Sequence, residues 1–147
     1  LDRMADSAEA LKLPGMQRIA RLREIDKEMQ NQSFLHVAGK AMMPAMARAA
    51  ELDLRRRAHM DLARTALAIE RYRLAKGDVP GRLEELVGEY LEEAPIDPFD
   101  GKAIRYRLAE PGYVLWSIGE DGEDNGGAER DKEKRDRPWD VTFIVTR

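Results

Sequence analysis

Closely spaced carboxylates in a glycine-rich segment are the residues of this chain best suited to chemistry. Residues 117–127 read Ser-Ile-Gly-Glu-Asp-Gly-Glu-Asp-Asn-Gly-Gly. Glycine lets such a segment fold into a tight loop, and several oxygen ligands on one loop suit a hard cation such as calcium. The pattern is therefore compatible with a calcium site near the C-terminus.

Five residues are candidate calcium ligands. Asp121 and Asp124 would supply carboxylates from the loop, and Asp140 would close the site from the following strand. The backbone carbonyl oxygens of Leu115 and Ser117 would complete the coordination shell, because calcium takes more oxygen ligands than three carboxylates supply. A solvated hairpin loop that holds no ion explains the same composition, and it stays open as the alternative.

An EF-hand is the best-known loop of this kind, and the segment from Asp121 to Gly126 matches its beginning. The twelfth position would be Lys132, where an EF-hand carries a bidentate glutamate. Strands are expected on both sides of the loop, whereas helices flank an EF-hand. The loop is therefore not an EF-hand, and any calcium site in it belongs to another type.

No arrangement typical of an enzyme stands out. His36 and His59 are the only histidines and lie far apart in the sequence, and the chain contains no cysteine. A zinc or catalytic site would need further convergent ligands. Carboxylates also crowd a short segment, at Glu84, Glu85, Glu89, Glu92 and Glu93. We expect a solvated helix face there rather than the paired carboxylates of a hydrolase, and hence no enzymatic activity.

Composition restricts the partners. The net charge of the 147 residues is −3 with both signs interleaved, which does not indicate a nucleic-acid partner. Without cysteine the chain forms no disulfides. The longest weakly polar run, residues 41–50, is shorter than a membrane span and contains Pro44 and Arg48. We expect protein partners or self-assembly, and a membrane link only through segments outside this chain.

Helices must come first along the chain. Residues 45–76 contain neither glycine nor proline and predict a long helix, in which Leu62, Ala66 and Ile69 share an apolar face with Leu67 and Leu74 beside them. A further helix is expected before it at 17–30, and a short one after it at 82–90.

Strands follow the helices. Residues 103–108, 113–118 and 141–146 alternate or are rich in β-branched and aromatic residues, with a turn at 110–112. Helices first and then a three-stranded antiparallel meander predict an α+β fold, in which the long helix packs on a small sheet. We expect two parts, a helical extension over 1–44 and an α+β domain over 45–147. The aromatic residues are expected to pack the helix against the sheet.

Several segments resemble the major pseudopilins of type II secretion. The run Ala-Leu-Ala-Ile-Glu-Arg-Tyr-Arg-Leu-Ala-Lys-Gly-Asp-Val-Pro at 66–80 is similar to the end of the pilin helix, and Trp-Ser-Ile-Gly-Glu-Asp-Gly at 116–122 resembles the family's Ser-x-Gly-x-Asp-Gly loop. The other matching segments are 83–87, 90–91, 95–102 and 105–106. Together they cover roughly residues 60–127, and Asp140-Val141 continues the match.

The resemblance implies a pilin-like fold, a long helix on a small antiparallel sheet, and a structural role in an assembly of the periplasm or cell envelope. It also implies calcium in the C-terminal loop. By position, Asp121 matches the first loop aspartate, with Asp124 and Asp140 as candidates for the later ones and Leu115 and Ser117 as carbonyl donors.

The chain departs from the family in three places. Phe99 and Asp100 stand where the family usually has Trp-Gly, and the loop over 127–138 is longer and carries cations that include Arg130, Lys132, Lys134 and Arg135. No apolar helix precedes residue 45, although pseudopilins polymerise through that helix. We therefore expect a pseudopilin-like domain on a different envelope protein, and as the alternative an interaction module in which residues 1–44 dock a partner and the sheet is a scaffold.

Overall fold

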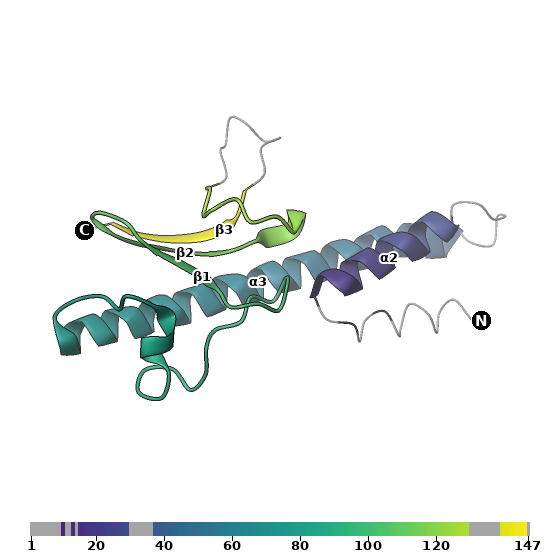
Figure 1. The fold of residues 1–147 in the computed structure, drawn as a ribbon. Coiled ribbons are helices and arrows are strands. Elements are labelled where there is room, and N and C mark those ends of the chain that lie inside the picture. The colour runs from purple at the N-terminus through teal and green to yellow at the C-terminus, as the bar shows by residue number, and fades with distance from the viewer. Residues whose placement is uncertain (1–9, 11–12, 14, 30–36, 130–138, 147) are drawn as a thin grey trace. The chain divides into compact units, whose positions relative to one another are not determined.

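A computed structural model of this chain describes residues 10, 13, 15–29, 37–129 and 139–146 (Figure 1). The chain forms two compact units, Leu1–Leu54 and Arg55–Arg147. The division falls inside one long helix, so each unit is described by itself. The early segment that precedes residue 10 and most of the long loop after Glu129 lie outside the described residues.

The two long helices lie close to where the sequence predicts, except for the start of the second. Helix α2 covers Gly15–Met29, as expected, and helix α3 covers Val37–Lys76. The predicted start of the long helix at Ala45 is wrong, because Pro44 lies inside α3. Proline removes one helical hydrogen bond, a cost that burial of its neighbours Met43 and Ala47 offsets. No helix among the described residues is both long and apolar enough to cross a membrane.

The first unit has a small apolar core of its own. Leu22 and Ile25 of α2 are buried together with small and flexible side chains from the first half of α3. The members of this core are Ala10, Leu22, Ile25, Met43, Ala47 and Ala50. An ion pair between Arg23 and Glu51 joins the same two helices at the surface. The apolar residues of α2 are therefore used inside the first unit.

The second unit combines the remainder of α3 with a three-stranded sheet. Strands β1 (Arg105–Leu108), β2 (Gly112–Ser117) and β3 (Val141–Thr146) form an antiparallel meander in the order β1-β2-β3. In the middle of the sheet Leu115 pairs with Tyr106 on one side and with Phe143 on the other. The predicted α+β arrangement of helices and a small antiparallel sheet is confirmed.

The predicted helix over 82–90 is wrong, since only one 3-10 turn forms, η2 at Leu83–Leu86. Gly88 adopts φ +93°, a left-handed conformation that ends any helix, and its N–H donates to the carbonyl of Leu91. A second 3-10 turn, η3 (Gly119–Asp121), follows β2 directly. These short turns shape the connections that carry the polar residues.

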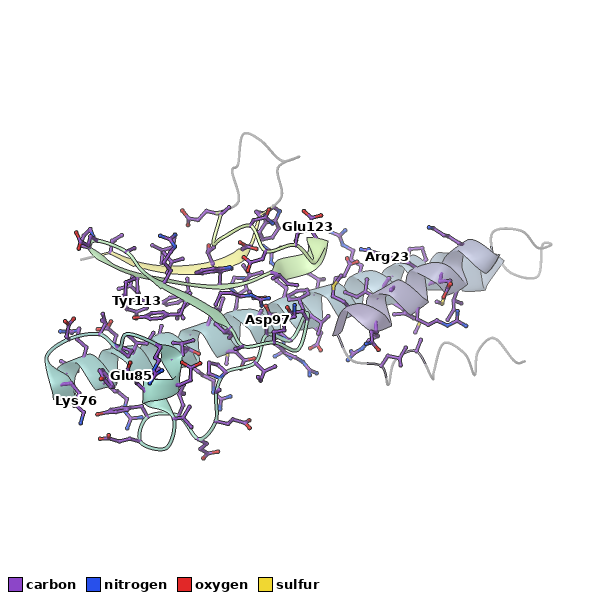
Figure 2. The ribbon with its side chains drawn as sticks, in the orientation of Figure 1. Arg23, Lys76, Glu85, Asp97, Tyr113 and Glu123 are labelled. Atoms are coloured by element: carbon purple, nitrogen blue, oxygen red, sulfur yellow. The ribbon has the colours of Figure 1, made fainter. Side chains whose placement is uncertain are left out.

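The sheet lies along the part of α3 that belongs to the second unit (Figure 1). Leu62 and Ile69 are fully buried in that part, and Tyr113 of β2 points toward the helix (Figure 2). The Tyr113 hydroxyl lies 3.2 Å from Glu70 Oε1, which ties the strand to the helix. Leu67 and Leu74 were expected beside the apolar face, but they are exposed, Leu67 by 65 %. A helix presents only one stripe to its sheet, and these two residues lie outside it.

Replacing Leu62 by alanine is expected to lower the free energy of unfolding of the second unit by about 2–5 kcal/mol, because the cavity cannot close fully. Leu67→Ala is the matched control on the same helix, with an expected change of at most about 0.5 kcal/mol. Denaturant unfolding followed by tryptophan fluorescence measures both, since Trp116 and Trp139 belong to this unit. Equal losses for the two variants would contradict this packing.

Candidate functional site

The segment Pro-Ile-Asp-Pro-Phe-Asp-Gly at 95–101 folds into a closed turn before β1. The N–H of Asp97 donates to the carbonyl of Lys102 at 2.7 Å, and the carbonyl of Asp97 accepts the N–H of Gly101 at 2.9 Å. The side chain of Asp97 also accepts the N–H of Phe99 at 2.9 Å, as aspartate does at the start of many turns. Aspartate at position 97 thus sets the conformation of the whole turn.

The carboxylate of Asp97 is fully buried beside the end of the sheet where β1 begins (Figure 2). Besides the N–H of Phe99, it accepts the Ser117 hydroxyl at 2.8 Å and the Ile118 N–H at 3.0 Å, both from the end of β2. The Arg105 guanidinium donates to it at 2.6 Å. Four donors from three segments therefore satisfy one buried charge, as burial of a carboxylate requires.

Arg105 forms ion pairs with three carboxylates. Its side chain is 15 % exposed, with Nη1 on Asp97, Nη2 at 2.6 Å from Asp100 and Nε at 3.5 Å from Asp124. Burial acts to raise the pKa of Asp100, but the hydrogen bonds from Arg105 and from the Lys102 N–H hold that pKa below its usual value. Arg105 is therefore the centre of a polar cluster that joins the turn, the first strand and the acidic loop.

The acidic loop, residues 119–128, lies against the sheet. The Trp116 indole N–H donates to Asp124 at 2.8 Å, and the Gly126 N–H donates to the same oxygen at 3.0 Å. These bonds, followed by the charge of Arg105, lower the pKa of Asp124. A Cβ on Gly127 would come within 3.1 Å of the Val114 side chain and 3.3 Å of the Trp116 ring. Glycine is required there, because φ is +79° as well.

Asp140 holds the other side of the loop. Its carboxylate is only 1 % exposed and accepts the Gly127 N–H at 2.8 Å and the Asn125 N–H at 3.3 Å. Asn125 also donates its side-chain amide to Asp121 at 3.2 Å, so one residue connects the two carboxylates. Desolvation raises the pKa of Asp140, although the backbone N–H groups act in the opposite direction.

The candidate calcium ligands occupy two kinds of position. Asp121, Asp124 and Asp140 all belong to the acidic loop or its anchor, but Asp124 already faces the Arg105 guanidinium. Leu115 lies in the middle strand, and Ser117 ends it with its hydroxyl on Asp97. Among the described residues no three histidine, aspartate or glutamate side chains are grouped closely enough to hold a metal ion. The calcium site stays a prediction, in which Asp121 and Asp140 are the carboxylates that form no ion pair with a described cation.

The remaining polar residues lie as the sequence indicates. All five glutamates of the segment after Gly81 are exposed, which confirms a solvated face. His59 is an exposed residue of α3, and burial of its ring followed by the charge of Arg55 lowers its pKa. His36 lies outside the described residues. A cavity of about 220 Å³ lies beside Tyr106, and Glu84 is the one glutamate of this segment that lines it.

Sequence reasoning missed the Asp97–Arg105 pair. The segment containing Asp97 was noted only for its resemblance. An arginine in an alternating strand is typical of a solvent-facing position, and nothing local indicates that it meets a buried carboxylate. The repeated aspartates of 95–101 beside a strand arginine were the one available signal. No family model, curated protein or solved structure matches this chain.

Asp97→Asn is expected to lower the free energy of unfolding by about 3–5 kcal/mol, because Arg105 loses a buried counter-charge while the shape of the side chain is kept. Asp78→Asn is the matched control, since Asp78 is exposed and its carboxylate accepts the neighbouring Val79 N–H. Its expected change is within about 0.5 kcal/mol. Denaturant unfolding compares the two, and a small loss for Asp97→Asn would contradict the role given to the pair.

The raised pKa of Asp140 predicts a pH dependence with a defined sign. A carboxyl that is more basic in the folded state favours folding most below its unfolded pKa of 3.8, and this contribution is lost as pH rises through the folded pKa. The stability of the wild type relative to Asp140→Asn should therefore fall between strongly acidic pH and neutrality. Thermal unfolding of both proteins in EDTA measures it. A relative stability that rises with pH would contradict the assignment.

Proposed function

We propose that this chain is a non-enzymatic structural or assembly domain of the pseudopilin type, carried by a cell-envelope protein. The observation that supports this proposal most is that the charged residues of the site make contacts within their own unit. Asp97, Arg105, Asp124 and Asp140 all bind segments of the same unit to one another rather than pointing together into a cavity. Side chains committed in this way stabilise a rigid domain, which is what an assembly subunit needs.

The arrangement of the second unit adds support. A long helix lies against a three-stranded meander, and an acidic glycine loop returns over the far side of the sheet onto Val114 and Trp116. The segments that resemble pseudopilins build these parts, including the turn with Asp97 and the loop with Asp121. Fold alone does not imply function, so the proposal depends on the resemblance together with the loop.

Calcium binding to the acidic loop belongs to the proposal. Asp121 and Asp140 would hold the ion. Asp124 and the carbonyl oxygens of Leu115 and Ser117 are the further predicted ligands. Bound calcium would supply positive charge to a buried carboxylate that now has only N–H donors. Because the ion would bind the folded loop alone, it would add to the free energy of unfolding.

The interaction-module alternative has less support. Leu22 and Ile25 of α2 are buried in the apolar core of the first unit. A partner that docked on this helix would therefore meet mainly its polar face. Such a face gives specificity, but it provides little apolar area for a stable interface.

Millimolar calcium is expected to raise the melting temperature of the wild-type chain relative to EDTA, because calcium would neutralise the carboxylates that anchor the loop. Asp121→Ala should abolish this difference. Glu93→Ala, which removes an exposed carboxylate outside the loop, should keep it. Differential scanning calorimetry measures the melting temperature of all three proteins. An identical value in calcium and in EDTA for the wild type would contradict the proposal that the loop binds calcium.

Self-assembly is the second measurable consequence. Sedimentation velocity over a wide range of protein concentration should show reversible association of the full chain, because an assembly domain presents a surface to further copies. Calcium and EDTA are compared in parallel. A sedimentation coefficient that stays at the monomer value at every concentration, in both solutions, would argue against self-assembly.

A further inference from the structure

The acidic loop meets a positive charge that belongs to the protein itself. Arg105 extends from the first residue of β1, and its guanidinium is held in place by Asp97 and Asp100 at 2.6 Å each. Both contacts use the terminal nitrogens and fix the plane of the group. The remaining nitrogen, Nε, lies 3.5 Å from Asp124 Oδ2. A fixed guanidinium loses less entropy on making one more contact than a free one.

Asp124 connects this charge to the surface that the loop covers. Its other oxygen, Oδ1, accepts the Trp116 indole N–H and the Gly126 N–H. The next residue, Gly127, lies against the Val114 side chain and the Trp116 ring. One carboxylate therefore links the arginine, the outer face of β2 and the backbone of the loop. If its charge were unbalanced, all three contacts would weaken together.

We propose that Arg105 is the resident cation of the acidic loop, and that it keeps the loop docked on the sheet in the absence of a metal ion. Asp97, Asp100 and Asp124 converge on it from two separate segments. Two other described cations lie nearby and are held less closely. Lys102 Nζ lies 3.9 Å from Asp100 on a mainly exposed side chain, and Arg55 Nη1 lies 3.8 Å from Glu120 of the loop. Without Arg105 the three carboxylates would repel one another, and Asp124 would leave the sheet. Arg105 is thus a positioning residue for the loop.

The inference also divides the loop into two ends, and this part rests on the proposed function. Asp124 at one end is held by a guanidinium, whereas Asp121 and Asp140 at the other end are joined only through Asn125. A calcium ion that used Asp124 would compete with the Arg105 guanidinium and the Trp116 N–H for the same two oxygens. We therefore assign calcium to the Asp121–Asp140 end, with Asp124 outside its shell.

Hydrogen exchange of the Trp116 indole N–H in EDTA tests the docking directly. Trp139→Phe leaves a single indole signal and serves as the background for all variants. The wild-type loop should protect this proton, and Arg105→Met should speed its exchange roughly tenfold or more, as loss of a partly buried ion pair implies. Arg107→Met is the matched control, because Arg107 lies two residues along the same strand but is exposed. It should leave the exchange rate unchanged.

Asp124→Asn tests the role of Arg105 in docking the loop even if Arg105→Met unfolds the chain. Asparagine retains an oxygen acceptor for the indole but carries no charge, so its attraction to Arg105 is lost and exchange should still accelerate. In the double variant the two effects should not add, because they remove the same ion pair. Unprotected wild-type exchange in EDTA, or a wild-type rate in both single variants, would overturn the proposal. Calcium plays no part in these measurements, so their failure is distinct from failure of the calcium proposal.

Calcium titration of Asp124→Asn then tests the assignment of the two ends. The increase of melting temperature seen for the wild type should persist in this variant and vanish in Asp121→Asn. Loss of the calcium effect in both variants would place Asp124 in the ion's shell and overturn the assignment. No effect in the wild type itself would contradict the calcium proposal and this assignment, while the exchange results for Arg105 would stand.

Discussion

The carboxylate of Asp97 has no access to solvent, and an ionised group in that position costs several kcal/mol unless donors replace water. The protein meets this requirement with the N–H groups of Phe99 and Ile118, the hydroxyl of Ser117 and the guanidinium of Arg105. These donors come from the turn before β1, the first residue of β1 and the end of β2. Satisfying one charge therefore fixes the register at which the meander starts, and much of the second unit follows from it.

The same constraint reaches the acidic loop through Arg105. Because the guanidinium is already oriented by Asp97 and Asp100, it presents its last nitrogen to Asp124 in one place. Asp124 then receives the Trp116 indole, and Gly127 lies where only glycine fits. Asp140 anchors the far side of the loop by accepting two backbone N–H groups. Polar contacts of this kind give a loop a single conformation that apolar packing alone would not specify.

Patterns with a fixed period gave good predictions here. The three strands, their order, helix α2 and the end of α3 at Lys76 all follow from local residue types. The start of α3 did not, because the burial of Met43 and Ala47 that offsets Pro44 is a tertiary effect. Only one turn forms in the segment 82–90, where a helix was expected. The left-handed conformation of Gly88 ends the helix, and the helix-favouring glutamates do not overcome it. For the site, the loop and its aspartates were identified, whereas the partner of Asp124 was not. A contact between Arg105 and Asp124 spans nineteen positions, and no local pattern reports it.

Asp97 and Arg105 stabilise the second unit as a pair. A double-mutant cycle on the free energy of unfolding, with Asp97→Ala, Arg105→Met and the double variant in EDTA, measures this coupling. The double variant should lose less than the sum of the two single variants by about 2 kcal/mol or more, as for residues that share one buried ion pair. Additive losses, with a coupling energy within about 0.5 kcal/mol of zero, would contradict it.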